Sequence, residues 1–152
     1  YGNIICTGQD KVLKFWGEKV VFMNNKIIRT DLRDSAPYCT RRFIEDTPTI
    51  IPILWFANEV AYTENTGYHY RMQKDSLTHK ASQFQYALFR ALCCFDLIDF
   101  FERNDKEILE KLPIVNMLHQ QLAIIKQNNN QVEIQQYINE WMEFSTRLIH
   151  RI

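Results

Sequence analysis

Histidines are the side chains of this chain best suited to bind a metal ion or to carry acid–base chemistry near neutral pH. The four histidines are His69, His79, His119 and His150. No two of them are three or four residues apart, the spacing that places two metal ligands on one face of a helix. A set of His69, His79 and Cys39 stays open as a metal site, but we predict neither a metal nor another cofactor.

The four cysteines, Cys6, Cys39, Cys93 and Cys94, form no Cys-x-x-Cys pair of the kind found in zinc sites. Adjacent residues of a helix point about 100° apart, so Cys93 and Cys94 are not expected to bridge each other. We therefore expect buried free thiols and a cytoplasmic or other reducing intracellular compartment. A disulfide between Cys6 and Cys39 stays open, because the sequence does not place these two thiols relative to each other.

Two carboxylates, Asp96 and Asp99, are three residues apart in a stretch that is otherwise apolar. Because a buried carboxylate is costly unless it is paired, we expect a basic partner such as Arg71, Arg90 or Arg103. The two carboxylates could form a tuned acid pair in a cleft, but the interpretation we favour is an internal salt bridge or a solvated stripe. The chain has no Gly-x-Ser-x-Gly and no phosphate-binding Gly-rich loop. The sequence thus identifies no catalytic residue, and an enzyme is the third function considered.

Residues 1–45 contain eight basic and five acidic residues, a local excess of three positive charges. Basic residues interleaved with Tyr38 and Phe43 are able to follow a phosphate backbone while the rings stack on bases. The segment 26–43 therefore predicts nucleic-acid binding as the second function. The competing interpretation is a solvated loop whose arginines pair with Asp31 and Asp34. The candidate nucleic-acid-binding residues are Lys26, Arg29, Arg33, Arg41 and Arg42.

Composition limits the possible classes of protein. Of the 152 residues, 46% are hydrophobic and 13% aromatic, which excludes disorder for most of the chain. The 18 basic and 18 acidic residues cancel, so the whole molecule is not attracted to nucleic acid or to an anionic membrane. No apolar run approaches the roughly 20 residues of a membrane span. These features favour a non-catalytic interaction protein: a subunit, adaptor or effector that binds another protein in a hetero-complex or as a homo-oligomer.

The elements that position these residues begin with a predicted β-hairpin. The sequence "KVLKFW" is rich in β-branched and aromatic residues, which favour strands. The apolar runs on both sides of Asn24 and Asn25 predict a tight hairpin turn. We therefore predict two or three short strands over residues 11–30 and a loop over 31–48.

The remainder of the chain is predicted to be helical. The helix over 76–103 is apolar on nearly every face, which is typical of a helix at the centre of a fold; its predicted core residues are Leu88, Leu92 and Phe95. We expect Thr49 and Asn104 to cap the helices that follow them. The predicted helices span 49–65, 76–103, 105–112, 113–127 and 131–150. The fold class is α-rich α+β: a single domain, 1–152, in which a short β-hairpin and loop region (1–48) packs on a bundle of four or five helices (49–152).

The helix predicted over 131–150 carries the residues on which the interaction hypothesis depends. A stripe of Ile134, Ile138, Trp141 and Leu148 is expected to pack on the bundle. The side chains expected to lie largely off that line are Tyr137, Met142, Phe144 and Ile149. Exposed aromatic and methionine side chains are enriched in protein interfaces. The alternative, that these side chains broaden the buried face, stays open. The predicted protein-interface residues are Tyr137, Trp141, Met142 and Phe144.

Overall fold

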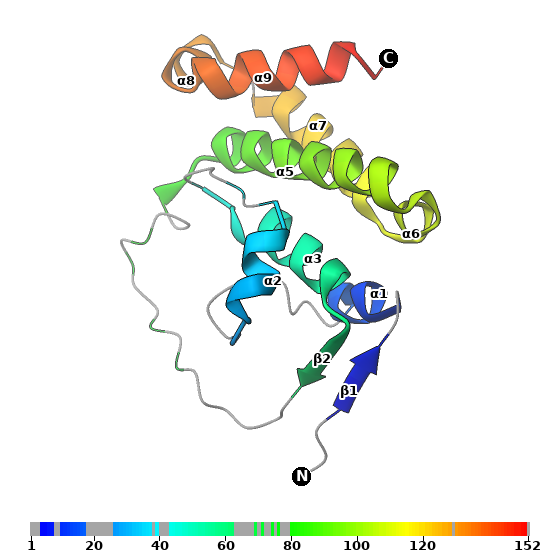
Figure 1. Cartoon of the computed structure of the whole chain (residues 1–152). Coiled ribbons are helices and arrows are strands. Elements are labelled where there is room, and N and C mark those ends of the chain that lie inside the picture. The colour runs from blue at the N-terminus through cyan, green and yellow to red at the C-terminus, as the bar shows by residue number, and fades with distance from the viewer. Residues whose placement is uncertain are drawn as a thin grey trace. The chain divides into compact units, whose positions relative to one another are not determined.

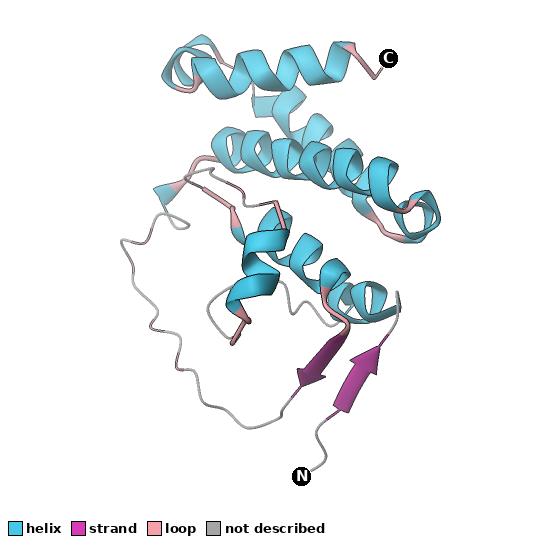
Figure 2. Cartoon of the chain, in the orientation of Figure 1, coloured by secondary structure: helices cyan, strands magenta, loops and turns pink. Residues whose placement is uncertain are grey.

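The computed structural model describes residues 4–7, 10–17, 26–37, 39, 43–62, 69, 71, 74, 76, 80–128 and 130–151. Most of these residues are helical (Figures 1 and 2), so the α-rich part of the predicted fold class is confirmed. The chain divides into two compact units. The first comprises Tyr1–Arg71 and Phe100–Leu112, and the second comprises Met72–Asp99 and Pro113–Ile152. That 1–152 behaves as a single domain stays a prediction.

The first unit contains an antiparallel pair of strands that are distant in the sequence. Strand β1 (Ile4–Thr7) pairs with β2 (Glu59–Tyr62), with Ile4 opposite Tyr62 and Thr7 opposite Glu59. Among the residues that the structure describes, three helices lie between the two strands in the chain, so β1 and β2 are not joined by a tight turn (Figure 2). The predicted β-hairpin is therefore not supported, and residues 18–25, which include its expected turn, lie outside the described residues.

Helix α1 (Asp10–Gly17) replaces the strand predicted for "KVLKFW". Val12 and Phe15 are both buried, and their spacing of three residues places them on one face of a helix. In a strand the same two side chains would point to opposite faces. The strand preference of these residue types is weak and depends on context; here the packing of α1 against α3 decides the conformation.

Helices α2 (Thr30–Ser35) and α3 (Asp46–Phe56) follow. The predicted loop over 31–48 is therefore wrong where α2 and the first turn of α3 lie. The predicted helix over 49–65 is too long, because α3 ends at Phe56 and residues 59–62 form β2. Thr49 does not cap α3 but lies inside it, where its Oγ1 donates to the Glu45 carbonyl oxygen at 2.8 Å. The same hydroxyl accepts from the backbone N–H of Cys39 at 3.3 Å. A continuous run from Pro48 to Leu54 is buried, which makes α3 the central element of this unit.

Helix α6 (Lys106–Lys111) also belongs to the first unit. Its N-terminal cap is Asp105 and not Asn104, because the Asp105 carboxylate accepts the backbone N–H of Ile108 at 3.0 Å. The Asn104 side chain instead donates to the carbonyl oxygen of Phe100 at 2.7 Å. The cap therefore lies one residue later than the sequence predicted.

The long helix α5 (Gln83–Asn104) contributes residues 83–99 to the second unit. It begins after Ser82, whose hydroxyl accepts the backbone N–H of Gln85 at 3.0 Å. The predicted core residues Leu88, Leu92 and Phe95 are fully buried, so their prediction is confirmed.

The second unit also contains α7 (Ile114–Asn128), α8 (Gln131–Gln136) and α9 (Ile138–Ile149). One helix was predicted for 131–150, but Tyr137, with φ −117° and ψ 39°, separates α8 from α9. Asn130 caps α8 by accepting the backbone N–H of Glu133 at 2.9 Å. No helix within the described ranges is long and apolar enough to cross a membrane.

Candidate protein-interaction site

One face of the C-terminal segment packs on α5 through aromatic rings. Phe144 is buried, and Tyr137 and Trp141 are half-buried. Their ring centroids lie 5.8–6.1 Å from those of phenylalanines on α5, within the range of favourable aromatic pairs. The three pairs are Phe84 with Trp141, Phe89 with Tyr137, and Phe95 with Phe144.

The expectation that Tyr137 and Phe144 lie off the buried face is wrong. Two helical stripes share Trp141 and Leu148, and the predicted buried face followed the one through Ile138. The stripe that faces α5 runs through Tyr137, Trp141 and Phe144, spaced by four and three residues. It buries the larger rings, and larger apolar area gives the larger stabilisation. A partner-binding role for these side chains stays a prediction; Met142 is the exposed member of the predicted set.

A group of charged side chains holds the end of α9 to α5, and we call it the polar clasp. The Arg147 guanidinium donates from Nη1 to Asp96 Oδ1 at 2.6 Å, and from Nη2 to Asp99 Oδ2. It also donates to Glu143 Oε1 at 3.2 Å, while Arg151 donates to the second oxygen of Asp99. The sequence predicted a salt bridge for these two aspartates but did not propose Arg147 or Arg151 as partners.

The electrostatics of the polar clasp suit a structural role. Burial acts to lower the pKa of Arg147, but hydrogen bonds and charge attraction from Asp96 and Asp99 outweigh it and raise that pKa. The guanidinium carbon of Arg147 also lies 5.2 Å from the ring centroid of Phe95, a cation–π contact. A guanidinium that is shared by two carboxylates and lies on an aromatic ring suits an internal salt bridge.

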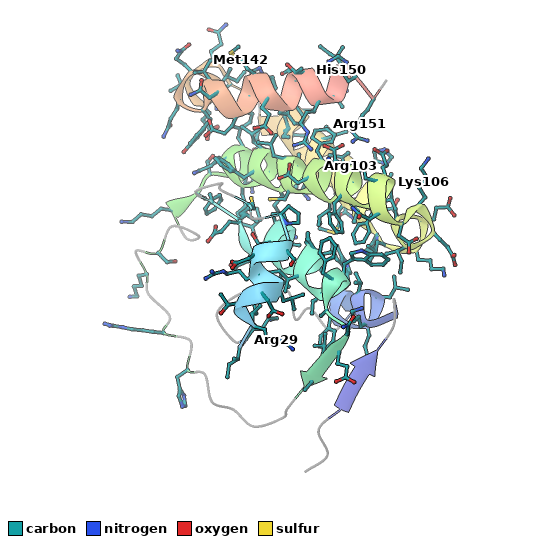
Figure 3. All side chains as sticks on the ribbon, in the orientation of Figure 1. Arg29, Arg103, Lys106, Met142, His150 and Arg151 are labelled. Atoms are coloured by element: carbon teal, nitrogen blue, oxygen red, sulfur yellow. The ribbon has the colours of Figure 1, made fainter. Side chains whose placement is uncertain are left out.

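The opposite face of α8 and α9 is exposed and uncharged. Its large apolar members are Val132, Met142 and Ile149, whose exposed fractions are 78%, 61% and 71%. Figure 3 shows Met142 and His150 on the side of α9 turned away from α5. Exposed residues of this face are spaced alternately by three and four, and we call them the outer stripe. They are Val132, Gln135, Asn139, Met142, Thr146 and Ile149.

The described candidates for nucleic-acid binding are paired locally or partly buried. Arg29 contacts Asp31 and Arg33 contacts Asp34, each with a nitrogen–oxygen distance of 2.8 Å. Burial lowers the pKa of Lys26, and the charge of Asp46 opposes that shift. The pairing agrees with the alternative interpretation of a solvated segment. Arg41 and Arg42 lie outside the described residues.

The histidines and cysteines give no chemical site in the part of the chain that the structure describes. His69, His119 and His150 are exposed, and no group of three or more potential metal ligands is found among the described residues. Burial raises the pKa of the Cys94 thiol to about 11, which makes it a poor nucleophile at neutral pH. His79 and Cys6 lie outside the described residues, so neither the His–Cys set nor a Cys6–Cys39 disulfide is tested.

Comparison of the chain with known protein families, with curated proteins and with solved structures finds no match.

Proposed function

We propose that this chain is a non-catalytic protein-interaction module and that the outer stripe of α8 and α9 is its docking surface for another protein. The observation that carries the proposal is the exposure of Met142 and Ile149, seven residues apart on one uncharged side of α9, together with the exposure of Val132 on α8. Exposed apolar side chains that gather on one face, with few charges among them, are typical of interface cores.

The contacts on the inner face of α9 support the proposal by fixing the helix that presents this stripe. The aromatic pairs with α5 and the polar clasp hold both ends of α9. A surface on an anchored helix loses little conformational entropy when a partner binds, so more of the contact energy remains as affinity. The subunit or adaptor role predicted from the sequence is consistent with such a surface.

A reducing intracellular compartment is part of the proposal. Its support is that Cys93 and Cys94 are buried next to each other on α5, a position that suits structural thiols rather than an exported disulfide framework. Nucleic-acid binding and enzymatic activity remain the second and third hypotheses, and no contact of the described residues favours either.

The experiment that tests the proposal replaces two members of the outer stripe with glutamate, as Met142→Glu with Ile149→Glu. Wild-type and variant chains are used to capture proteins from the cells that produce the chain. Because a glutamate in the centre of an apolar interface would be buried without a partner, and disruption of such a centre costs about 2 kcal/mol or more, we expect captured proteins to fall at least about tenfold. Val115→Glu is the matched control, since Val115 on α7 is 44% exposed but lies outside the outer stripe.

The thermal midpoint of each variant separates lost binding from lost folding. Substitutions at exposed positions change stability by roughly 0.5 kcal/mol or less, so all three proteins are expected to unfold at similar temperatures. Equal capture by the wild-type chain and the double variant would contradict the proposed docking surface.

A further inference from the structure

The break between α8 and α9 is not explained by the residue types around it. Residues 131–151 contain neither proline nor glycine, the residues that most often interrupt a helix. Helical hydrogen bonds reach Tyr137 from both sides. Its backbone N–H donates to the Glu133 carbonyl oxygen at 3.1 Å, and its own carbonyl oxygen accepts from the N–H of Trp141 at 2.9 Å. The break therefore depends on the backbone angles of Tyr137, φ −117° and ψ 39°, which are not helical.

A contact with α5 accounts for these backbone angles. The ring of Tyr137 packs edge-on against that of Phe89, with 6.1 Å between the centroids and 87° between the planes. Phe89 is buried, so its ring is held in place by the core of the second unit. Because a segment as short as α8 has little helical stability of its own, packing decides its conformation. We therefore attribute the break to the contact with Phe89.

The bent arrangement forgoes three helical hydrogen bonds. The first N–H groups of a helix have no acceptor within that helix, and for α9 these are the groups of Ile138, Asn139 and Glu140. The residue before them, Tyr137, gives no side-chain cap. With helical angles at Tyr137, the three N–H groups would donate to carbonyl oxygens four residues earlier, on α8. No residue of α8 is buried, so its movement would expose no core side chain.

The outer stripe depends on the same junction. Residues spaced by three and four lie on one face only when they belong to one helix, and α8 and α9 are separate helices. Val132 and Gln135 on α8 are therefore out of helical register with Met142 and Ile149 on α9. In one continuous helix, all six residues of the outer stripe would form a single face.

We propose that Tyr137 is a hinge at which α8 and α9 join into one helix, residues 131–149, and that the joined form completes the outer stripe. The role of the hinge rests on the proposed function. A partner protein that contacts Val132 together with Met142 binds the joined form more tightly and so increases its population. The bent form, held by Phe89, keeps the α8 part of the docking surface out of line until such a partner binds.

Hydrogen exchange of the free chain tests the hinge without a partner. Tyr137→Ala removes the ring contact with Phe89 and introduces the residue of highest helix propensity, so it is expected to join the two helices. The amides of Asn139 and Glu140 then gain acceptors, and NMR is expected to show exchange at least about tenfold slower than in the wild-type chain. Tyr137→Phe keeps the ring and is the matched control, with exchange expected to equal that of the wild type. Equal or faster exchange in a folded Tyr137→Ala chain would overturn the inference.

Ile138→Pro tests the role of the hinge in binding. Ile138 is the first residue of α9, a position that accepts proline. Inside a joined helix the same proline disfavours the joined form by about a hundredfold or more. We expect Ile138→Pro to capture at least about tenfold less protein, from the cells that produce the chain, than Ile138→Ala. The alanine variant loses the same side-chain packing, so the two thermal midpoints are expected to be similar.

The outcomes separate the hinge from the docking surface. Equal capture by Ile138→Pro and Ile138→Ala would overturn the role of the hinge in binding. If Met142→Glu with Ile149→Glu still loses captured proteins in that case, the docking surface stands and the hinge is wrong. If the double glutamate variant captures as much as the wild-type chain, the proposed function fails, and the exchange of Asn139 and Glu140 then decides the hinge alone.

Discussion

Arg147 on α9 donates a hydrogen bond of 2.6 Å to Asp96 on α5, 51 residues earlier in the chain. The Arg147 side chain is 18% exposed, so this contact is only weakly screened by water. It joins the C-terminal helix to the most buried helix of the second unit. The position of α9, and with it the presentation of the outer stripe, depends on this contact and on the aromatic pairs beside it.

Arg147→Met is expected to lower the free energy of unfolding by about 1–3 kcal/mol, because it leaves Asp96 half-buried without this guanidinium. The control is Arg33→Met, which removes a pair with Asp34 whose side chains are both mostly exposed; its expected cost is below about 1 kcal/mol. Urea denaturation of both variants measures the difference. Equal costs for the two arginines would show that the polar clasp does not hold α9.

Leu92→Ala tests the core of the second unit. Leu92 is fully buried, and a large-to-small substitution at such a site costs about 2–5 kcal/mol. Ile149→Ala, at an exposed position of α9, is the control and is expected to change stability by no more than about 0.5 kcal/mol. If the urea midpoint of Leu92→Ala hardly moves, α5 is not the central helix of its unit.

Cys94 predicts a loss of stability at alkaline pH. Burial raises the pKa of its thiol from 9.0 to about 11 in the folded protein, so the folded chain keeps the proton after the unfolded chain has lost it. The stabilisation is therefore complete below pH 9 and disappears as the pH rises toward 11. Two pKa units correspond to about 2–3 kcal/mol.

The measurement is the free energy of unfolding of the wild-type chain and of Cys94→Ala between pH 8 and 11, with a steeper decline expected for the wild type. Lys11 makes the free energy of unfolding rise with pH, since burial lowers its pKa. Because Lys11 is present in both proteins, its contribution cancels in the comparison. Parallel curves for the two proteins would contradict the assigned pKa of Cys94.

The sequence predicts those features that depend on nearby residues. Apolar residues occur on nearly every face of α5, so Leu88, Leu92 and Phe95 are predicted as core residues without any knowledge of the neighbouring helices. The partner of Asp96 was missed because Arg147 is distant in the sequence, and nearby arginines were equally good candidates. The face of α9 was misassigned because stripes through Ile138 and through Tyr137 both satisfy helical spacing, and only the phenylalanines of α5 select between them.

The wrong prediction of a strand where the structure has helix α1 has a different cause. The residue types in "KVLKFW" favour strands, whereas the spacing of Val12 and Phe15 also fits one face of a helix. In so short a segment the two signals cannot be separated. Contact with α3 determines which of them is realised.

The nucleic-acid hypothesis is tested by the salt dependence of binding to heparin or DNA. Replacing Arg41 and Arg42 with alanine should reduce the salt slope by about two charge units if these residues contact phosphates. Because Arg29 and Arg33 are paired with aspartates, we expect weak retention that is lost at moderate salt. Tight retention by the wild-type chain, with a slope that the double substitution flattens, would favour nucleic-acid binding over the proposed function.

The rate of Met142 oxidation tests the central claim most directly. Dilute hydrogen peroxide converts exposed methionine to the sulfoxide, and mass spectrometry follows Met142 beside the half-buried Met117 of α7 as an internal reference. If the outer stripe is a docking surface, Met142 is expected to oxidise several-fold more slowly in the complex with a captured partner protein than in the free chain. Met117 is expected to keep its rate. An equal rate for Met142 in both states would contradict the assignment of the outer stripe as the interface.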